Sequence, residues 1–109
     1  ADFAFGRYNL GNLYNNLGET DRAIAAHEKA IAIDNAFYPA KSNLALLLNE
    51  RGENGRAEQL LREVLDGEPE LYEVAYSLGI LLVEMGRHGE ALEFLARASE
   101  GMPYRSRIH

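Results

Sequence analysis

Histidines and carboxylates are the side chains of this sequence best suited to metal or acid–base chemistry. The three histidines are His27, His88 and His109, and none lies at ligand spacing from another. Cysteine is absent, which removes thiolate zinc sites, disulfides and cysteine nucleophiles. His27-Glu28 begins like the metalloprotease helix motif, but Ile31 stands where the second histidine is required. The sequence therefore predicts no metal site, and it favours packing or surface roles for His27 and His88.

Acidic residues are abundant, but no pair of them stands apart as a general acid and base. Those expected on the solvent faces of helices are Glu28, Glu58, Glu63, Glu90 and Glu93. Nucleophile-elbow, P-loop, dinucleotide-binding and calcium-loop motifs are missing. We therefore expect no catalytic residue, no cofactor and no enzymatic activity.

Asparagine is the remaining side chain that could bind a ligand, through hydrogen bonds of its amide group, and it is concentrated in the first half of the chain. Six asparagines fall within expected helices: Asn9, Asn12, Asn15, Asn16, Asn43 and Asn49. Asparagine is a mediocre helix former, so this density needs a reason. One reason is that an amide can donate to and accept from a peptide group, which grips an extended backbone whatever its side chains. The alternative is that the amides bond to one another between neighbouring helices.

A repeat positions these asparagines. Three sets of identical residues recur at a spacing of thirty-four: Leu10, Leu44 and Leu78; Gly18, Gly52 and Gly86; Ala23, Ala57 and Ala91. Chance rarely gives three columns with one period, so the chain is built from three copies of one unit.

Within each copy, apolar residues at steps of three and four predict two helices joined at the glycine. The first helices are expected near 5–17, 39–51 and 73–85, and the second near 21–33, 55–66 and 89–100. Thr20 or Asp21 is expected to cap the helix that follows Gly18. Pro69 and Pro103 are expected to end their second helices.

The period and its columns resemble the tetratricopeptide repeat. The leucine column is filled three times, and a small residue follows it each time, as Gly11, Ala45 and Gly79. The phenylalanine column holds His27, Leu61 and Leu95, and the tryptophan column is lost. The resemblance implies an all-α fold, a right-handed α-solenoid of three antiparallel helix hairpins. The repeats would span 4–37, 38–71 and 72–105, with 106–109 beginning a fourth repeat, which suggests a fragment of a longer array.

The resemblance also implies a concave groove lined by the first helix of each repeat. The candidate groove residues are Tyr8, Asn12, Asn15, Asn16, Asn43, Leu46, Asn49, Glu50, Glu73, Tyr76, Ile80 and Val83. We expect a protein or peptide ligand there. The alternative for Ile80 and Val83 is packing on a further repeat.

Charge and hydropathy restrict the partners. A formal net charge of −6 argues against nucleic acid, and no apolar run is long enough to span a bilayer. The chain is expected to be soluble, in cytosol or periplasm. Family members that bind acidic chaperone tails clamp two carboxylates with lysine, arginine and asparagine. Those places hold no cation in this sequence: Tyr8, Asn12, Asn43, Glu73 and Ser77. We therefore expect no binding of chaperone C-terminal tails.

Two other functions remain open from the sequence. The first is self-assembly into a homo-oligomer through the end faces or the groove. At the uncapped C-terminal face the last hairpin presents five side chains, some of which would meet a next repeat: Leu81, Leu82, Leu92, Leu95 and Ala98. The second is a regulatory or recruiting role within a larger multidomain protein.

Overall fold

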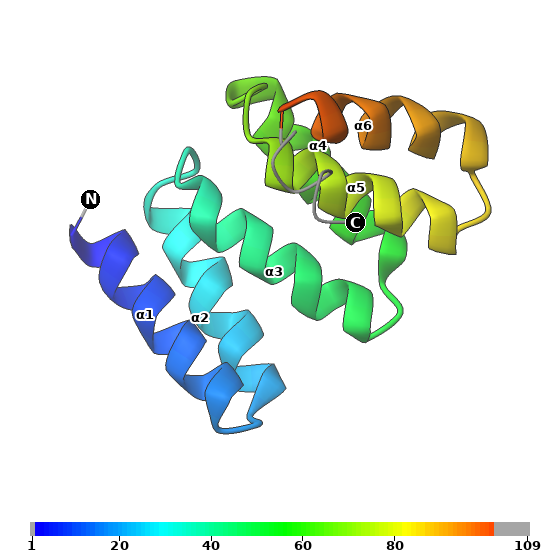
Figure 1. Ribbon diagram of the computed structural model, residues 1–109. Helices are drawn as coiled ribbons and strands as arrows, with labels where there is room; N and C mark the ends of the chain where they lie inside the picture. The colour runs from blue at the N-terminus through cyan, green and yellow to red at the C-terminus, as the bar shows by residue number, and fades with distance from the viewer. Residues whose placement is uncertain (1, 102–109) are drawn as a thin grey trace. The chain divides into compact units, whose positions relative to one another are not determined.

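The computed structural model describes residues 2–101 (Figure 1). These residues form six α-helices: α1 (Asp2–Asn16), α2 (Thr20–Ile33), α3 (Tyr38–Glu50), α4 (Asn54–Gly67), α5 (Tyr72–Glu84) and α6 (His88–Gly101). The predicted helices are confirmed, with boundaries displaced by up to three residues. The expectations for Pro103 and for a fourth repeat at 106–109 lie outside the described residues.

A glycine with left-handed backbone closes each hairpin. The φ angles of Gly18, Gly52 and Gly86 are 78°, 83° and 77°, a region that a residue without a Cβ enters at little cost. In the first hairpin the N–H of Glu19 donates to the carbonyl of Tyr14 at 2.9 Å, which satisfies a carbonyl at the end of α1. Equivalent bonds follow Gly52 and Gly86. The thirty-four-residue glycine spacing is therefore a spacing of helix ends.

The predicted cap of α2 is wrong. The residue before the helix is Glu19, which makes no side-chain cap hydrogen bond, and Thr20 and Asp21 already lie in the first turn. The glycine turn leads straight into the helix, since the Glu19 carbonyl accepts the first helical bond from Ala23 at 3.0 Å. A helix that begins this close to the preceding turn leaves no extended residue at which Thr20 could act as a cap.

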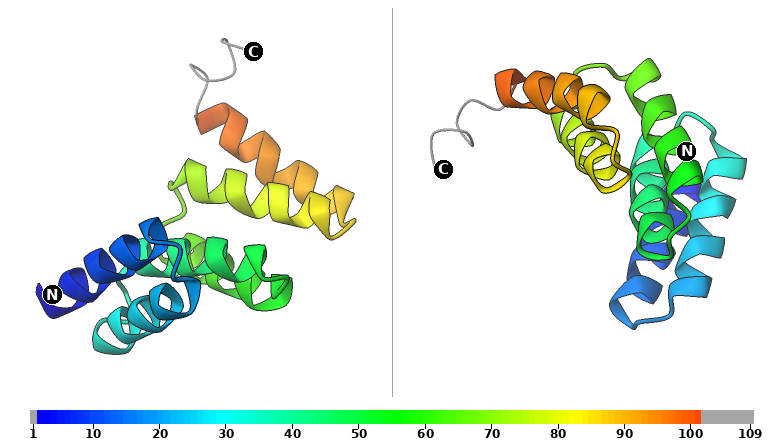
Figure 2. Two further views of the ribbon diagram at one scale, coloured as in Figure 1. Left: turned by 90° about the horizontal axis from the view of Figure 1, so that it is seen from below. Right: turned by 90° about the vertical axis from the view of Figure 1, so that its right-hand side faces the viewer.

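The chain divides into two compact units, Ala1–Leu60 and Leu61–His109. In the first unit α1 packs along α2, and α3 packs on α2 (Figures 1 and 2). The α1–α2 contact is close because Gly11 faces the buried ring of His27. A Cβ added at Gly11 would lie 2.7 Å from Cε1 of His27. Ala23 is fully buried, as the hairpin pattern predicted.

In the second unit α5 packs along α6 by the same device. Gly79 faces Leu95, whose Cδ2 would lie 2.6 Å from an added Cβ, and Ala91 is buried. Gly101 lies against the ring of Tyr72. Both hairpins thus depend on a glycine of the first helix opposite a large side chain of the second.

The last hairpin corrects one sequence prediction. Some of five side chains were expected at an uncovered end face, but Leu81, Leu82 and Ala98 are buried and Leu95 is half-buried. Only Leu92 among the five is exposed, at 69%. The apolar periodicity could not separate side chains that face the hairpin from those that face outward, because α5 is apolar around most of its circumference.

Candidate peptide-binding face

One face of the first unit carries eight of the predicted groove residues, and we call it the asparagine face. Its members are Tyr8, Asn12, Asn15 and Asn16 of α1, with Asn43, Leu46, Asn49 and Glu50 of α3. Steps of three and four residues place each set on one side of its helix. Asn15, Asn16 and Glu50 are exposed, and the other polar members are half-buried.

Two of the asparagines join α1 to α3. Nδ2 of Asn43 donates to Oδ1 of Asn12 at 2.8 Å. The alternative raised from the sequence, a bond between neighbouring first helices, therefore holds for this pair. It does not hold for Asn15, Asn16 and Asn49, whose side chains make no hydrogen bond within residues 2–101.

The amide pair still has hydrogen-bonding capacity. The bond uses one N–H of Asn43 and one lone pair of Asn12, which leaves the amide group of Asn12 and the carbonyl oxygen of Asn43 without a side-chain partner in the described chain. A peptide group needs one donor and one acceptor, and these two atoms supply both. Because the shared bond fixes both side chains, they lose little further rotamer freedom when a ligand binds.

An aromatic cluster adjoins the asparagines at the start of α1. The ring of Tyr8 lies 5.4 Å from that of Phe37, nearly edge-on, and 5.7 Å from the buried ring of His27. Phe5 lies 6.1 Å from Tyr8 and is 53% exposed. Tyr8 was predicted as a ligand contact, and the structure shows it packed in this cluster. Phe37, which comes from the turn between α2 and α3, was not among the predicted site residues.

The second unit carries the other four candidates on α5, and we call them the α5 stripe: Glu73, Tyr76, Ile80 and Val83. Steps of three and four place them on one side of the helix. Tyr76, Ile80 and Val83 are 45%, 38% and 40% exposed. These three side chains therefore form an exposed apolar patch within the described chain. Whether the stripe and the asparagine face act together stays a prediction.

Titratable groups with shifted pKa values lie outside both faces. Burial lowers the pKa of His27, so its imidazole is neutral at pH 7. Hydrogen bonds from Arg87, the nearer at 2.8 Å, lower the pKa of the exposed Glu90 on α6. The asparagine face therefore has amides and apolar surface to offer a ligand, with Glu50 as its one ionisable carboxylate.

Two further features concern metal ions and membranes. Residues 2–101 contain no group of three or more histidine, cysteine, aspartate or glutamate side chains placed to hold a metal ion. Within the same range, every helix is too short or too polar to cross a bilayer.

Comparison with known families decides the family. A tetratricopeptide repeat model matches residues 48–109, more than half of the chain, and a second matches residues 4–37. The chain belongs to the tetratricopeptide repeat family. None of the curated protein sequences matches it.

Solved structures show the same fold for this tetratricopeptide repeat chain, an all-α solenoid of helical hairpins. The crystal structure of MamA is 24% identical with a TM-score of 0.87, over 95% of this chain and 61% of MamA. The first tetratricopeptide domain of Spaghetti (RPAP3), bound to the HSP90 peptide SRMEEVD, is 20% identical with a TM-score of 0.89, over 94% and 81% of the two chains. YrrB, described as having an unusual peptide-binding site, is 20% identical with a TM-score of 0.84, over 92% and 52%. The chain thus spans about three fifths of MamA and half of YrrB.

Proposed function

We propose that this tetratricopeptide repeat chain is a non-catalytic scaffold that binds an extended peptide segment on its asparagine face. The observation that carries the proposal is the amide pair of Asn12 and Asn43, which is fixed by a 2.8 Å hydrogen bond and retains a free donor and acceptor. Exposed Asn15 and Asn16 continue the same polar surface along α1.

The chemistry of the face favours recognition of peptide backbone over recognition of charge. Its amides are neutral, and its only ionisable carboxylate is Glu50. The positions of a two-carboxylate clamp hold Tyr8 and Glu73 in place of cations. A terminal carboxylate would lose its hydration there without gaining a charge-assisted bond. An extended, uncharged segment with an apolar side chain for the exposed Leu46 suits the face better.

Similar folds support the class of ligand. The RPAP3 domain holds a peptide, and YrrB is described by its peptide-binding site. We propose that this chain also binds a peptide, with its own amides as the contacts. Self-assembly through the last hairpin receives less support, because Leu92 is the one expected end-face residue that is exposed.

A panel of unstructured peptides with varied sequences, scored by fluorescence anisotropy, tests the proposal. Peptides that bind should lose affinity about tenfold to the double variant Asn12→Ala, Asn43→Ala, since two hydrogen bonds are removed at about 0.5–1.5 kcal/mol each. The matched control is Asn35→Ala, which removes an exposed amide in the turn after α2 and should bind normally. If no peptide binds, or if the double variant binds as tightly as the control, the proposed function is wrong.

A further inference from the structure

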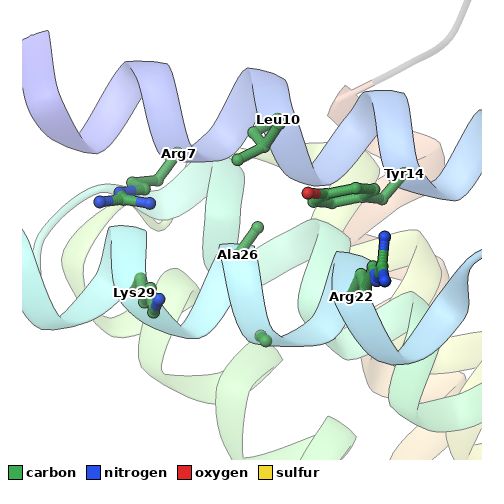
Figure 3. A pocket seen from close by; sticks show the side chains of 7 residues that line it. Arg7, Leu10, Tyr14, Arg22, Ala26 and Lys29 are labelled. Atoms are coloured by element: carbon green, nitrogen blue, oxygen red, sulfur yellow. The ribbon is translucent and has the colours of Figure 1, made fainter.

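A pocket of about 250 Å³ opens between α1 and α2 (Figure 3). It is lined by Arg7, Leu10, Tyr14, Arg22, Ala25, Ala26 and Lys29. Figure 3 shows Arg7 and Lys29 at one end, Tyr14 and Arg22 at the other, and Leu10 and Ala26 between them. The pocket thus has an apolar middle with a positive charge at each end.

The pocket exists because a small side chain lies at its floor. Ala26 occupies the position that Leu60 and Phe94 occupy in the next two repeats, thirty-four and sixty-eight residues later. Both of those larger side chains are buried. In the last hairpin Phe94 is flanked by two arginines, with the guanidinium carbon of Arg97 5.1 Å from the ring centre. The first hairpin keeps a cation at the position of Arg97, as Lys29, and has the small Ala26 in place of the phenylalanine.

Three cations on one small surface are unusual in a chain of net charge −6. Arg7 and Lys29 make no ion pair within residues 2–101. Arg22 makes an exposed pair with Glu19 at 3.3 Å and lies over the ring of Tyr14, and an exposed pair of this kind exchanges readily. The pocket therefore has positive charge available for a ligand.

The next repeat shows which ligand group suits an arginine at this position. Arg56 lies thirty-four residues after Arg22, at the start of its own second helix, and donates to the carboxylate of Glu28 at 2.9 Å. Glu28 comes from the neighbouring helix α2. The repeat position that holds Arg22 in the first hairpin therefore holds, in the second, an arginine that is paired with a carboxylate from a neighbouring hairpin.

We propose that this pocket is a second binding site, which takes an acidic peptide segment with an apolar side chain between two carboxylates. Arg7 and Tyr14 lie seven residues apart on α1, as do Arg22 and Lys29 on α2, so the two ends of the pocket are about 10 Å apart. In a peptide with the extended polyproline II conformation, which has three residues per turn and a rise of about 3.1 Å, residues three apart are about 9 Å apart and point to the same side. The ligand is thus an extended segment with carboxylates at its first and fourth residues.

This site is distinct from the asparagine face. Successive residues of a helix are rotated by about 100°, which places Arg7, Leu10 and Tyr14 on the side of α1 roughly opposite Asn12 and Asn16. The apolar middle of the pocket favours a peptide over a polyanion such as nucleic acid, which the net charge of the chain repels. The two proposals can therefore fail independently.

A direct test uses two synthetic peptides and the isotope-labelled protein. The probe is Gly-Ser-Glu-Ala-Leu-Glu-Ser-Gly, blocked at both ends, and the control peptide replaces both glutamates by glutamine. The probe should shift the backbone amide resonances of Arg22, Ala26 and Lys29, more weakly as salt is raised, and the control peptide should not. Moving the glutamates next to each other should weaken binding.

Matched variants identify the pocket as the site. The double variant Arg7→Glu, Lys29→Glu should weaken binding of the probe at least tenfold. Arg97→Glu is the matched control, because Arg97 occupies on α6 the position that Lys29 occupies on α2. Ala26→Phe should abolish binding by filling the pocket, with helicity and melting temperature recorded for every variant.

Three results would overturn the proposal. The first is an absence of shifts with the probe at millimolar concentration on the unmodified chain, which no folding defect can explain. The second is equal binding of the glutamine peptide, which would make the cations irrelevant. The third is a change of the α1 and α2 resonances on dilution of the protein alone, which would show that the pocket holds a second copy of the chain.

Discussion

The first and last hairpins share one frame and differ in what fills it. Leu10, Gly11 and Ala23 of the first correspond to Leu78, Gly79 and Ala91 of the last, sixty-eight residues later. The outward residues diverge, since the Asn12 and Asn15 positions of α1 hold Ile80 and Val83 in α5. The outward side of α1 is therefore polar and the outward side of α5 is apolar, although both helices belong to hairpins of the same kind. The repeat therefore specifies the residues of the hairpin contact, while the residues on the outward side of the first helix are free to vary.

The largest expected effect tests the shared frame. Ala23→Leu and Ala91→Leu should each cost ~1–3 kcal/mol of unfolding free energy, because a larger side chain overpacks a fully buried hairpin contact. Urea denaturation followed by circular dichroism measures both. A large loss at one position with none at the other would show that the two hairpins are not packed alike.

Alanine substitutions at the glycines that face the second helices should lower the unfolding free energy by different amounts in the two hairpins. Gly11→Ala places a Cβ against the rigid ring of His27 and should cost about 1–2 kcal/mol. Gly79→Ala meets Cδ2 and Cγ of Leu95, a side chain that can move more readily than a ring, and gains about 1 kcal/mol of helix propensity, so its net cost should be smaller than that of Gly11→Ala. Combining Gly11→Ala with His27→Ala should relieve the clash, which a double-mutant cycle would measure.

A pH titration should report on the buried His27. Because burial lowers the pKa of His27 below 6.5, the unfolded chain binds its proton more readily than the folded chain. The stabilisation is complete above pH 6.5 and should be lost as the pH falls through the pKa of the folded state. His27→Phe should flatten this part of the profile, as denaturation at pH 5 to 8 would show.

The smallest expected effect concerns the polar surface. Asn12→Ile copies the residue of the last repeat and removes the hydrogen bond to Asn43, which should cost about 0.5–1.5 kcal/mol. Asn15→Val copies Val83 at an exposed position without a partner and should be nearly neutral. Equal losses from the two changes would mean that the amide bond adds nothing to stability.

Much of the fold could be predicted from the sequence, and less of the candidate site. The hairpins and their glycine turns follow from local periodicity, whereas the assignment of Leu46 and of the α5 stripe to a groove stays a prediction. The role of Asn12 was left open, because two amides thirty-one residues apart meet only when α1 and α3 are packed. The pocket of Arg7 and Lys29 was missed for the same reason, since each residue alone is an ordinary surface cation.

The sequence by itself determined where the helices end and which small residues, Ala23, Ala57 and Ala91, are buried in the hairpins. Those features depend on a helical period of 3.6 residues and on three glycines with left-handed backbone, and both are properties of short segments. Only the tertiary structure decided that His27 covers Gly11, that Asn43 bonds to Asn12 and that the space over Ala26 stays open. Each of these depends on the distance between two helices. That distance is set by all the side chains packed between them, and no single segment of the sequence contains it.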